Sequence, residues 1–572
     1  MNYSEYSTQL LIVGGALSGI SAALTAKKIY KDLDILVADK CDASYGYSGK
    51  SSRTAGLLSF VTHEDDPEAF VEFHTREIGT YLNDQDLLRE YANSSDTVLR
   101  SLKEWGVEIL EDENGYPDYL KWPFPWGTAS IDPDASVSMA NTAKKMGIRY
   151  LERVVIYRLL TSCCGVAGAI GFSLNTGELV VIHANAVILA CGSQNYDITK
   201  AWAATGNGIA MAFNAGAKMR NCEYGNMCDF ARVGEDGTVE YAAAHTAHDH
   251  LYVGDKNISQ YYRPGMHSSM DPVAAYAWYK ETMKGNLVEA DIGEFQQAEG
   301  NSFFKFHPKA MFRRDWEHTP QFPKADRFPV IPGFIGELSC VYTDHRMQTS
   351  IPGLFAVGDT SGGGTARAGA VATPPGKIHG TGIYNAVFTG IEGGRGASAV
   401  ASKLPIPTVE FDPNTIELLS ANIFAPLNRK EGIHVREMIH EIQDIIMPTD
   451  YSLVKSGDRI QEALDKINAM LIKLPEVYVN NLHELAKYVD LLSMILGAKL
   501  FYTASLERKE SRGFHLREDY PYTDNENFLK WIIIQKGENG RFDISFEDIP
   551  MDRYLYKPRE KRSQVFVDVP IK

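Results

Sequence analysis

Hydrophobic positions near the start of the chain follow the pattern of a strand, a turn, a helix and a second strand. The apolar run Leu10 to Val13 leads through glycines into the alanine-rich segment "LSGISAALTAKKI". The stretch "LDILVADK" then supplies another apolar run, which ends at Asp39. Short apolar runs bounded by glycine are typical of buried parallel strands. We therefore predict a βαβ unit at the N-terminus.

Later stretches of the chain predict further strands and helices. "GELVVIHANAVILACGS" predicts two strands, and "TGNGIAMAFNAGAKM" predicts a glycine turn followed by an amphipathic helix. "SIPGLFAVGDTSGGG" predicts a strand that ends at Asp359. The segment from Pro67 to Trp105 reads as largely helical, and from about Asp412 to Ser511 apolar residues recur at i, i+3, i+4 and i+7. This last pattern predicts a helical bundle.

Length and charge narrow the class of protein. A chain of 572 residues with 44% hydrophobic and 23% charged residues is expected to form two to four globular domains. The formal net charge of -16 argues against nucleic acid and anionic membranes as partners of the whole surface. No run of 18 or more apolar residues is present, and "MNYSEYSTQ" lacks the basic and apolar regions of a secretory signal. We expect no membrane span and a cytoplasmic location.

The cysteines and histidines do not predict a metal or disulfide framework. None of the seven cysteines forms a C-x-x-C pair, so neither a disulfide framework nor a four-cysteine iron–sulfur cluster is predicted. The histidines of "AAAHTAHDHLYV" have a spacing that fits no helix-borne zinc motif. We therefore predict no metal site.

The first glycine turn has the chemistry of a dinucleotide site. Gly14 permits a tight turn, Gly19 permits close packing of helix on strand, and the helix N-terminus offers N–H groups to a pyrophosphate. Asp39 is placed to accept hydrogen bonds from a ribose. The pattern departs from G-x-G-x-x-G at one position, where Ala16 replaces the middle glycine.

A late loop, "GDTSGGGTARAGAVATPPGKIHG", resembles a nucleotide-triphosphate P-loop at its end. Six residues separate Gly369 from Gly376, whereas a P-loop has four, and Ile378 stands where the magnesium-binding Ser or Thr is required. Two prolines also remove N–H donors from the cradle. An ATP site is therefore not expected, and Gly376 is the predicted start of a helix.

The order of "IVGGALSG", "LVADK", "ANAVILACGS", "TGNGIAMAFNAGAKM" and "IPGLFAVGD" resembles the succinate dehydrogenase/fumarate reductase flavoprotein superfamily. "ERKESRGFHLREDYPYTDNENFLKW" is similar to the C-terminal signature of that family, and the resemblance runs from about residue 8 to 535. "YTDHRMQTSIPGLFAVGD" and the lack of a flavin-linking histidine look more like the adenylylsulfate reductase α-subunit branch.

The resemblance implies an α/β FAD-binding Rossmann-like domain of the glutathione-reductase type, with an inserted α+β capping domain and a C-terminal helical bundle. We expect residues 1–224 and 341–405 to form the FAD-binding domain, 225–340 the capping domain and 410–515 the helical domain. Residues 516–572 are expected to form a C-terminal extension, with its last stretch reaching toward a partner.

The resemblance also implies the cofactor and its ligands. In fumarate reductases an early loop carries a histidine bonded to the flavin, but no histidine lies between Lys40 and Val61 here, so noncovalent FAD is expected. The residues expected to bind FAD are Gly14, Ala16, Leu17, Ser18, Gly19, Asp39, Lys40, Ser51, Ser52, Arg53, Thr54, Ala55, Ala190, Gly192, Asp359 and Gly376.

Three residues are candidates for catalysis. The resemblance implies that the loop from Asp359 to Pro375 crosses the flavin, before a helix that starts at Gly376 and whose dipole stabilises reduced flavin. Arg367 lies in this loop and offers a guanidinium for bidentate binding of carboxylate, sulfate or phosphate. Its alternative role is to serve the FAD pyrophosphate or solvent. Arg232 matches a pocket arginine of the adenylylsulfate reductases, with a solvated surface arginine as the alternative. His345 could donate a proton near neutral pH, and a structural histidine is the alternative. The chain departs from both catalytic patterns of the family, with Cys228 near the place of one histidine.

We expect an FAD-dependent oxidoreductase, and three functions remain open. The first is the catalytic flavoprotein subunit of a reductase or dehydrogenase acting on a small anion, fumarate/enoate- or adenylylsulfate-reductase-like. Because no second nicotinamide fingerprint and no cluster cysteines are present, electrons are expected from a ferredoxin-like iron–sulfur subunit. The second is a stand-alone flavoprotein resembling aspartate oxidase. The third is an electron-transfer flavin subunit without its own substrate. The oligomeric state is left open and includes a higher oligomer.

Overall fold

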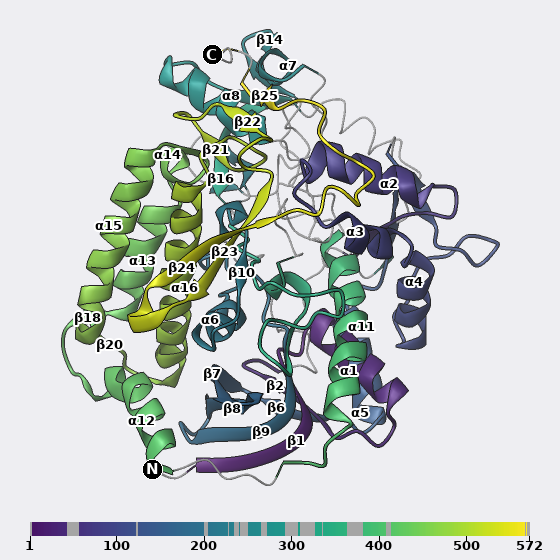
Figure 1. Cartoon of the computed structure of the whole chain (residues 1–572), viewed down its shortest axis with the longest axis vertical. Coiled ribbons are helices and arrows are strands. Elements are labelled where there is room, and N and C mark those ends of the chain that lie inside the picture. The colour runs from purple at the N-terminus through teal and green to yellow at the C-terminus, as the bar shows by residue number, and fades with distance from the viewer. Residues whose placement is uncertain are drawn as a thin grey trace.

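A parallel sheet forms one end of the molecule, a helical bundle forms one side, and a smaller sheet with two helices forms the opposite end (Figure 1). The computed structural model describes residues 3–42, 56–121, 124–198, 204–226, 228–233, 239–240, 250–264, 272–291, 307–308, 327–334, 336–362, 381–407, 413–566 and 568.

Most strands of the main sheet are parallel, including those that end at the candidate site. Its order is β6 (Arg149–Glu152), β2 (Ile35–Asp39), β1 (Tyr3–Val13), β9 (Leu179–Leu189), β8 (Gly165–Ser173) and β7 (Val154–Ser162), with β17 (Leu354–Ala356) paired to the end of β9. Strands β6, β2, β1, β9 and β17 are parallel, whereas β7 and β8 form an antiparallel hairpin. The carboxyl ends of the parallel strands therefore meet at one edge.

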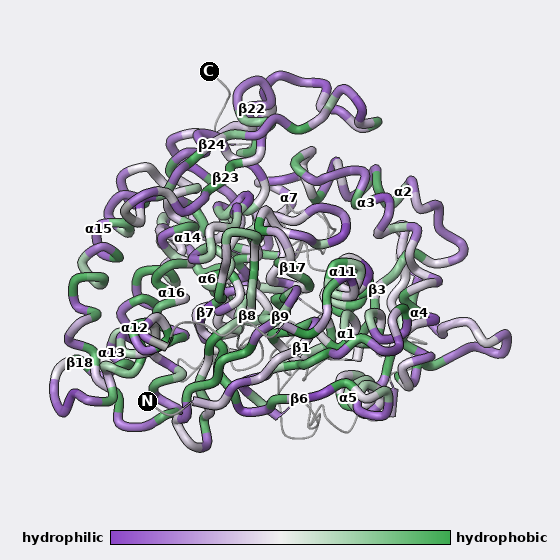
Figure 2. Tube along the Cα trace, turned by 60° about the horizontal axis from the view of Figure 1, so that its bottom comes forward, coloured by the Kyte–Doolittle hydropathy of each residue, from purple (hydrophilic) through white to green (hydrophobic). Residues whose placement is uncertain are grey.

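Both faces of this sheet are buried, as expected for parallel strands. Along β1, Leu10 and Ile12 pack toward α1 (Leu17–Ile29), α5 (Ala135–Lys145) and α11 (Thr381–Ala401). Leu11 and Val13 point to the other face, toward α6 (Asn207–Asn214) and α16 (Leu482–Glu507). The hydrophobic colour along much of β8 and β9 in Figure 2 follows from this double coverage, whereas in β1 only the last four residues, Leu10 to Val13, are apolar.

Helices α1 and α11 approach so closely that their contact depends on glycine. A Cβ built on Gly390 lies 2.6 Å from the carbonyl oxygen of Ser18, and one built on Gly394 lies 2.5 Å from that of Ala22. Any side chain at these positions would push the helices apart. The run "TGIEGGRG" therefore determines how near α11 sits to the first glycine turn.

The segment after the second strand is helical, as predicted. It contains α2 (Pro67–Phe73), the π-helix η3 (His74–Ile78), α3 (Gln85–Ala92) and α4 (Ser95–Glu104). A small antiparallel sheet in the order β3 (Leu57–Phe60), β5 (Gly127–Ser130) and β4 (Tyr119–Lys121) lies beside it.

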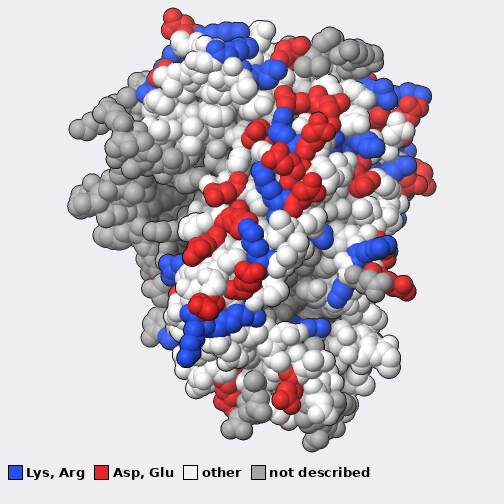
Figure 3. Space-filling model, turned by 90° about the vertical axis from the view of Figure 1, so that its left-hand side faces the viewer, with Lys and Arg blue, Asp and Glu red and all other residues white. Residues whose placement is uncertain are grey.

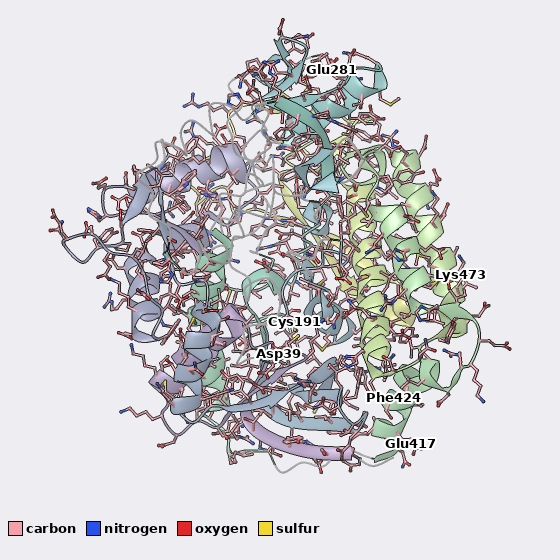
Figure 4. All side chains as sticks on the ribbon, turned by 180° about the vertical axis from the view of Figure 1, so that it is seen from behind. Asp39, Cys191, Glu281, Glu417, Phe424 and Lys473 are labelled. Atoms are coloured by element: carbon pink, nitrogen blue, oxygen red, sulfur yellow. The ribbon has the colours of Figure 1, made fainter. Side chains whose placement is uncertain are left out.

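The inserted region has α+β composition. Its sheet runs in the order β12 (Val239–Glu240), β11 (Cys228–Val233), β16 (Arg327–Phe334), β15 (Glu289–Asp291), β13 (Leu251–Val253) and β14 (Lys256–Asn257). Helices α7 (Ile258–Tyr262) and α8 (Pro272–Met283) pack on it. Buried Glu281, labelled in Figure 4, accepts hydrogen bonds from Tyr262 and Asn286 and fixes the end of α8.

The helical bundle consists of α12 (Pro413–Phe424), α13 (Val435–Ile446), α14 (Thr449–Ser452), α15 (Gly457–Lys473) and α16. Two short strand pairs accompany it: β18 (Ile433–His434) pairs with β20 (Val477–Tyr478), and β19 (Val454–Lys455) pairs with β21 (Leu516–Arg517). Among the described helices, α16 alone is long and apolar enough to cross a membrane by length and composition. Within its apolar window, 72% is buried inside the protein, so here it serves as the core helix of the bundle.

Two predicted strand boundaries are wrong. The stretch "LVVIHANAVIL" forms the single strand β9 rather than two strands, because its pairing with β1 keeps the same register before and after Asn185. Strand β17 ends at Ala356, and Asp359 lies in the following 3₁₀ turn η6 (Gly358–Thr360).

The C-terminal stretch folds back on the chain instead of extending away from it. Strand β23 (Lys530–Lys536) pairs with β10 (Met219–Arg220) and with β24 (Phe542–Asp548), and β25 (Arg562–Gln564) pairs with β22 (Tyr522–Asp524). The remaining short 3₁₀ elements in the described segments are η5 (Cys222–Tyr224), η7 (Ala425–Asn428), η8 (Leu474–Glu476) and η9 (Glu538–Gly540). The division into four domains stays a prediction.

Candidate cofactor-binding site

The first glycine turn joins β1 to α1 and has no room for side chains at two positions. Gly14 has φ of +107°, and a Cβ there would lie 2.4 Å from the carbonyl oxygen of Ala190. A Cβ on Gly19 would lie 1.9 Å from the carbonyl oxygen of Gly14. The turn, the helix and the end of β9 are thus in backbone contact, in agreement with the roles that the sequence predicts for both glycines.

The missing middle glycine does not strain this turn. Ala16 is the N-cap of α1 with φ of -85° and ψ of -173°, an extended conformation that any residue adopts. The N-cap residue makes no side-chain hydrogen bond, and the first turn of α1 contains no acidic residue. The positive end of the helix dipole, with Leu17 and Ser18 in its first turn, is therefore suited to an anion.

Asp39 closes the site on the β2 side. Its Oδ2 accepts a hydrogen bond from the N–H of Gly15 at 2.5 Å, and its Oδ1 accepts one from the N–H of Cys41 at 2.7 Å. The carboxylate is buried, and these bonds fix its orientation, although each carboxylate oxygen can accept more than one hydrogen bond. This geometry suits a residue that accepts from ribose hydroxyls.

The neighbouring Lys40 points to the helical bundle. Its Nζ lies 3.0 Å from Thr205 Oγ1 and 3.4 Å from Asp490 Oδ1, on α16. Burial acts to lower the pKa of Lys40, but the charge and hydrogen bond of Asp490, together with the charges of Cys41 and Asp39, outweigh it and raise that pKa. Lys40 thus connects the dinucleotide turn with α16, and its contact with FAD stays a prediction.

The end of β9 contributes small residues to the same edge. The Sγ of Cys191 donates to the carbonyl oxygen of Val13 at 3.4 Å, and burial raises the pKa of this thiol to about 12. Figure 4 shows Cys191 and Asp39 close together at this edge. Gly192, with φ of +78°, follows, and its carbonyl oxygen accepts from Thr360 Oγ1 at 3.2 Å. Ala190 and Gly192 therefore lie at this edge, and their contact with FAD stays a prediction.

Asp359 is the residue that most directly indicates a ligand site. Its Oδ1 is buried and has no hydrogen-bond partner among the described residues. The turn that carries it is fixed, because the N–H of Gly358 donates to Thr389 Oγ1 on α11 at 2.8 Å. A buried carboxylate oxygen without a donor is costly, so the site fits a ligand that brings hydroxyl groups. Sequence reasoning missed Thr389, whose role follows only from the packing of α11 on β17.

These features fit FAD at the carboxyl edge of the sheet. The glycine turn and the N-terminus of α1 suit a pyrophosphate, Asp39 suits the adenosine ribose, and Asp359 suits the hydroxyls of the ribityl chain. Ser51, Ser52, Arg53, Thr54, Ala55, Arg367 and Gly376 lie outside the described residues, so their roles remain predictions.

Of the catalytic candidates, Arg232 and His345 lie in described segments. Arg232 is in β11, in register with Glu240 and Val330, and its side chain is outside the described ones. The His345 ring is hydrogen bonded to Glu90 Oε1 at 2.8 Å and to Asp84 Oδ2 at 3.2 Å. The bond with Asp84 raises the pKa of His345 to about 9, against the effect of burial. His345 is therefore a cation near neutral pH that joins the segment before β17 to α3.

A buried network of arginines and glutamates was not predicted as such, although most of its residues lie in the C-terminal signature. Arg508 donates through Nε to Glu223 Oε1 at 2.6 Å and through Nη1 to Glu510 Oε1 at 2.9 Å. Arg512 donates to both oxygens of Glu510, at 2.8 and 2.9 Å. All four side chains are fully or almost fully buried. The signature therefore holds α16 against η5 at the root of β11.

Charges on the bundle surface are mixed in sign. Lys466 pairs with Glu462 and Lys473 with Glu441 along the exposed side of the bundle. Figure 3 shows basic and acidic groups interleaved on this face. The net negative charge is therefore not gathered into one acidic patch on this side of the described surface.

Comparison with known proteins agrees with the geometry. A family model described as "FAD binding domain" matches residues 9–227, and one described as "Fumarate reductase flavoprotein C-term" matches residues 439–563. An uncharacterized FAD-dependent oxidoreductase of Methanocaldococcus jannaschii is 27% identical over 94% of this chain and 97% of its own. One subunit of the fumarate reductase (CoM/CoB) of Methanothermobacter marburgensis is 24% identical over 95% of this chain and 100% of its own.

Solved structures share the fold. The flavoprotein chain of Escherichia coli quinol fumarate reductase superposes with a TM-score of 0.77 at 19% identity, covering 98% of this chain and 99% of its own. Adenylylsulfate reductase of Archaeoglobus fulgidus superposes with a TM-score of 0.75 at 20% identity, covering 96% of each chain. The predicted fold is confirmed, and the two likenesses are too similar to separate the branches.

Proposed function

Since the chain belongs to the fumarate reductase flavoprotein family of FAD-dependent oxidoreductases, we propose that it is the catalytic flavoprotein subunit of a reductase or dehydrogenase that acts on a small anion. The observation that carries the cofactor side is the buried Oδ1 of Asp359, which lacks a partner among the described residues at the edge where the Gly14 turn, Asp39 and Gly192 also converge. FAD, when bound there, supplies acceptance and release of an electron pair.

The chain's own residues have separate tasks in this proposal. The backbone around Gly14 and the N-terminus of α1 bind the pyrophosphate, and Asp39 and Asp359 orient the cofactor by accepting hydrogen bonds. The inserted region excludes water from the flavin face. Arg367 and Arg232 bind the anion through their guanidinium groups.

For His345 we propose a structural role in place of the proton donation that the sequence suggests first. A histidine with a pKa of about 9 remains protonated at neutral pH, whereas an efficient general acid has a pKa near the working pH. We therefore favour its structural alternative, an ion pair that holds the segment before β17 against α3. Proton delivery is then left to groups in the substrate pocket.

The electron partner is proposed to be a separate ferredoxin-like iron–sulfur subunit. Several relatives carry the word subunit in their names, among them the fumarate reductase relatives from Mycobacterium tuberculosis and Methanothermobacter marburgensis. The sequence has no second nicotinamide fingerprint and no C-x-x-C pair to bring electrons to the flavin. We also propose a cytoplasmic location, which rests on the lack of secretory-signal features in "MNYSEYSTQ".

The test is an anaerobic substrate screen. The purified chain is loaded with FAD, reduced by light, and mixed separately with fumarate, other enoates and adenylylsulfate, while flavin absorbance reports reoxidation. The proposal expects rapid reoxidation by one anion class and its loss in Arg367→Ala with FAD still bound. Equal reoxidation of wild type and Arg367→Ala by every anion would contradict a catalytic Arg367. In a separate sample exposed to air, reoxidation by oxygen but by no anion would favour an oxidase. Reoxidation by neither would favour an electron-transfer subunit.

A further inference from the structure

The β7–β8 hairpin presents two adjacent free thiols at its tip. Cys163 and Cys164 form the loop between the last residue of β7 and the first of β8, and both are exposed. Their Sγ atoms lie 3.6 Å apart. This tip is outside the cofactor edge, and neither thiol has a part in the proposed flavin chemistry.

The backbone holds the pair in place. Ser162 and Gly165 pair across the hairpin, and the N–H of Cys164 donates to Ser162 Oγ at 3.2 Å. Gly165, with φ of +126°, takes up the twist of the turn, so neither cysteine has a positive φ. A Cβ on Gly165 would lie 2.2 Å from the carbonyl oxygen of Pro352, which also accepts the N–H of Val166. The contact with Pro352 therefore holds the turn in place, and the backbone that carries the two thiols is fixed.

The spacing of the sulfurs suits chelation. A disulfide requires sulfurs at about 2.05 Å, far below the 3.6 Å observed. With metal–sulfur bonds of about 2.3 Å, as for zinc, sulfurs at that separation subtend about 100° at the metal. This angle is close to the tetrahedral value, so one ion can bind both sulfurs without moving the turn.

We propose that Cys163 and Cys164 form a bidentate site for one thiophilic divalent cation of the Zn²⁺ and Cd²⁺ type. On binding, the two thiols release two protons and two metal–sulfur bonds form, with no change of oxidation state. Because the pair lies at the surface, the two remaining tetrahedral positions are open to water or to ligands from another molecule.

The other described cysteines are poor competitors. Cys222 and Cys340 are buried, and burial keeps the pKa of Cys191 at about 12. Cys41 is half-buried, and burial and the charge of Asp39 raise the pKa of its thiol. The hydrogen bond with Cys163 also raises the pKa of the Cys164 thiol, but these two thiols alone among the described cysteines are both exposed and adjacent. A titration with a thiophilic ion under reducing conditions should therefore report the hairpin pair first.

The test is a Cd²⁺ titration of the full-length, FAD-loaded chain, followed by the ultraviolet sulfur-to-cadmium charge-transfer band and by native mass spectrometry. Wild type is expected to bind one tight equivalent more than the Cys163→Ser/Cys164→Ser double variant. Each single serine variant should bind that equivalent about 10²-fold more weakly, because chelation is lost. Zn²⁺ should displace the Cd²⁺, and Thr161→Ala, at an exposed neighbour, should bind like wild type.

Equal tight binding by wild type and the double variant would overturn the proposal, as would a single variant with wild-type affinity. FAD content and thermal midpoint of the double variant are expected to match wild type. A loss confined to the charge-transfer band therefore reports the thiols and not misfolding.

Discussion

The cofactor edge and the Arg508 network are both buried polar regions, but they are completed in opposite ways. In the network, Arg508 makes hydrogen bonds with Glu223, Glu510 and two backbone carbonyl oxygens, so its donors are used within the chain. At the cofactor edge, the Oδ1 of Asp359 is buried without a partner in the described part of the chain, and glycines leave space where side chains would stand.

This difference separates a structural polar region from a binding one. Buried charges that are paired inside the chain hold elements together, and Glu223, whose Oε2 has no partner among the described residues, is still paired with Arg508 through Oε1. Asp359 Oδ1 instead lacks a donor at an edge where glycines leave space, and this combination indicates a ligand. Substitutions in the network should therefore change stability first, and substitutions at the edge should change FAD affinity first. The following predictions test that distinction.

The largest effect is expected from Arg508→Met. Removing the guanidinium leaves Glu223 and Glu510 buried with one charged partner fewer, which costs about 3–5 kcal/mol. We expect the midpoint temperature of thermal unfolding to fall strongly, or soluble protein to be lost. Lys561→Met is the matched control, because its pair with Glu526 is 81% and 53% exposed, and no measurable change is expected. Equal midpoints for the two variants would contradict a structural network.

Gly14→Ala should combine strain with a clash. Its φ of +107° disfavours any L-residue, and its Cβ would meet the carbonyl oxygen of Ala190 at 2.4 Å. We expect a loss of at least about 2 kcal/mol and purification without FAD.

Gly147→Ala isolates the strain, because Gly147 has φ of +80° and no described atom lies within 4 Å of a built Cβ. It should cost about 1 kcal/mol and retain FAD. The readouts are the thermal midpoint and the flavin-to-protein absorbance ratio. If both variants kept FAD equally, close backbone contact at Gly14 would not be needed for binding.

Asp359→Asn should weaken FAD binding with little change in the fold of the apoprotein. Losing a charged acceptor costs about 1.5–3 kcal/mol, or about 10- to 100-fold in Kd. The measurement is quenching of flavin fluorescence on titration of apoprotein. Asp548→Asn, at a side chain 86% exposed, is the control and should bind FAD normally. An unchanged Kd for Asp359→Asn would remove this residue from the site.

The smallest effect is expected at His345. Its folded pKa of about 9 exceeds the ordinary 6.5, so its ion pair stabilises fully below pH 6.5 and the contribution disappears as pH rises through 9. The bond from His345 lowers the pKa of Asp84 to about 2 despite burial, so that side contributes above pH 3.8 and fails as pH falls through 2.

His345→Gln should therefore lower the thermal midpoint by about 2 °C or less between pH 4 and 6.5, and by less above pH 9. Turnover should be retained. His440→Gln, exposed on α13, is the control and should show no such pH dependence. A large loss of turnover at an unchanged midpoint would instead support the catalytic role of His345.

The sequence predicted the site best where chemistry and local spacing coincide. The run from Leu10 to Asp39 contains its strand, turn, helix and acid within one short stretch, so period and glycine spacing are enough to predict the βαβ unit. It was less successful for β9, because the polar residues His183 and Asn185 interrupt the apolar run and suggest a break that the strand does not have. The Arg508 network was also missed, since charged residues in a row do not reveal which of them will be buried together.

By itself, the sequence determined the dinucleotide turn, the parallel sheet and the helical bundle, because hydrophobic period and glycine position act over a few residues, and its resemblance to a known family implied FAD. Only the tertiary structure decided that Asp359 keeps an acceptor without a partner among the described residues, that His345 pairs with Asp84 and Glu90, and that the C-terminal strands return to β10. These facts depend on contacts between segments far apart in the chain. A side chain's partners, and hence its charge state and availability to a ligand, are set only when those segments pack.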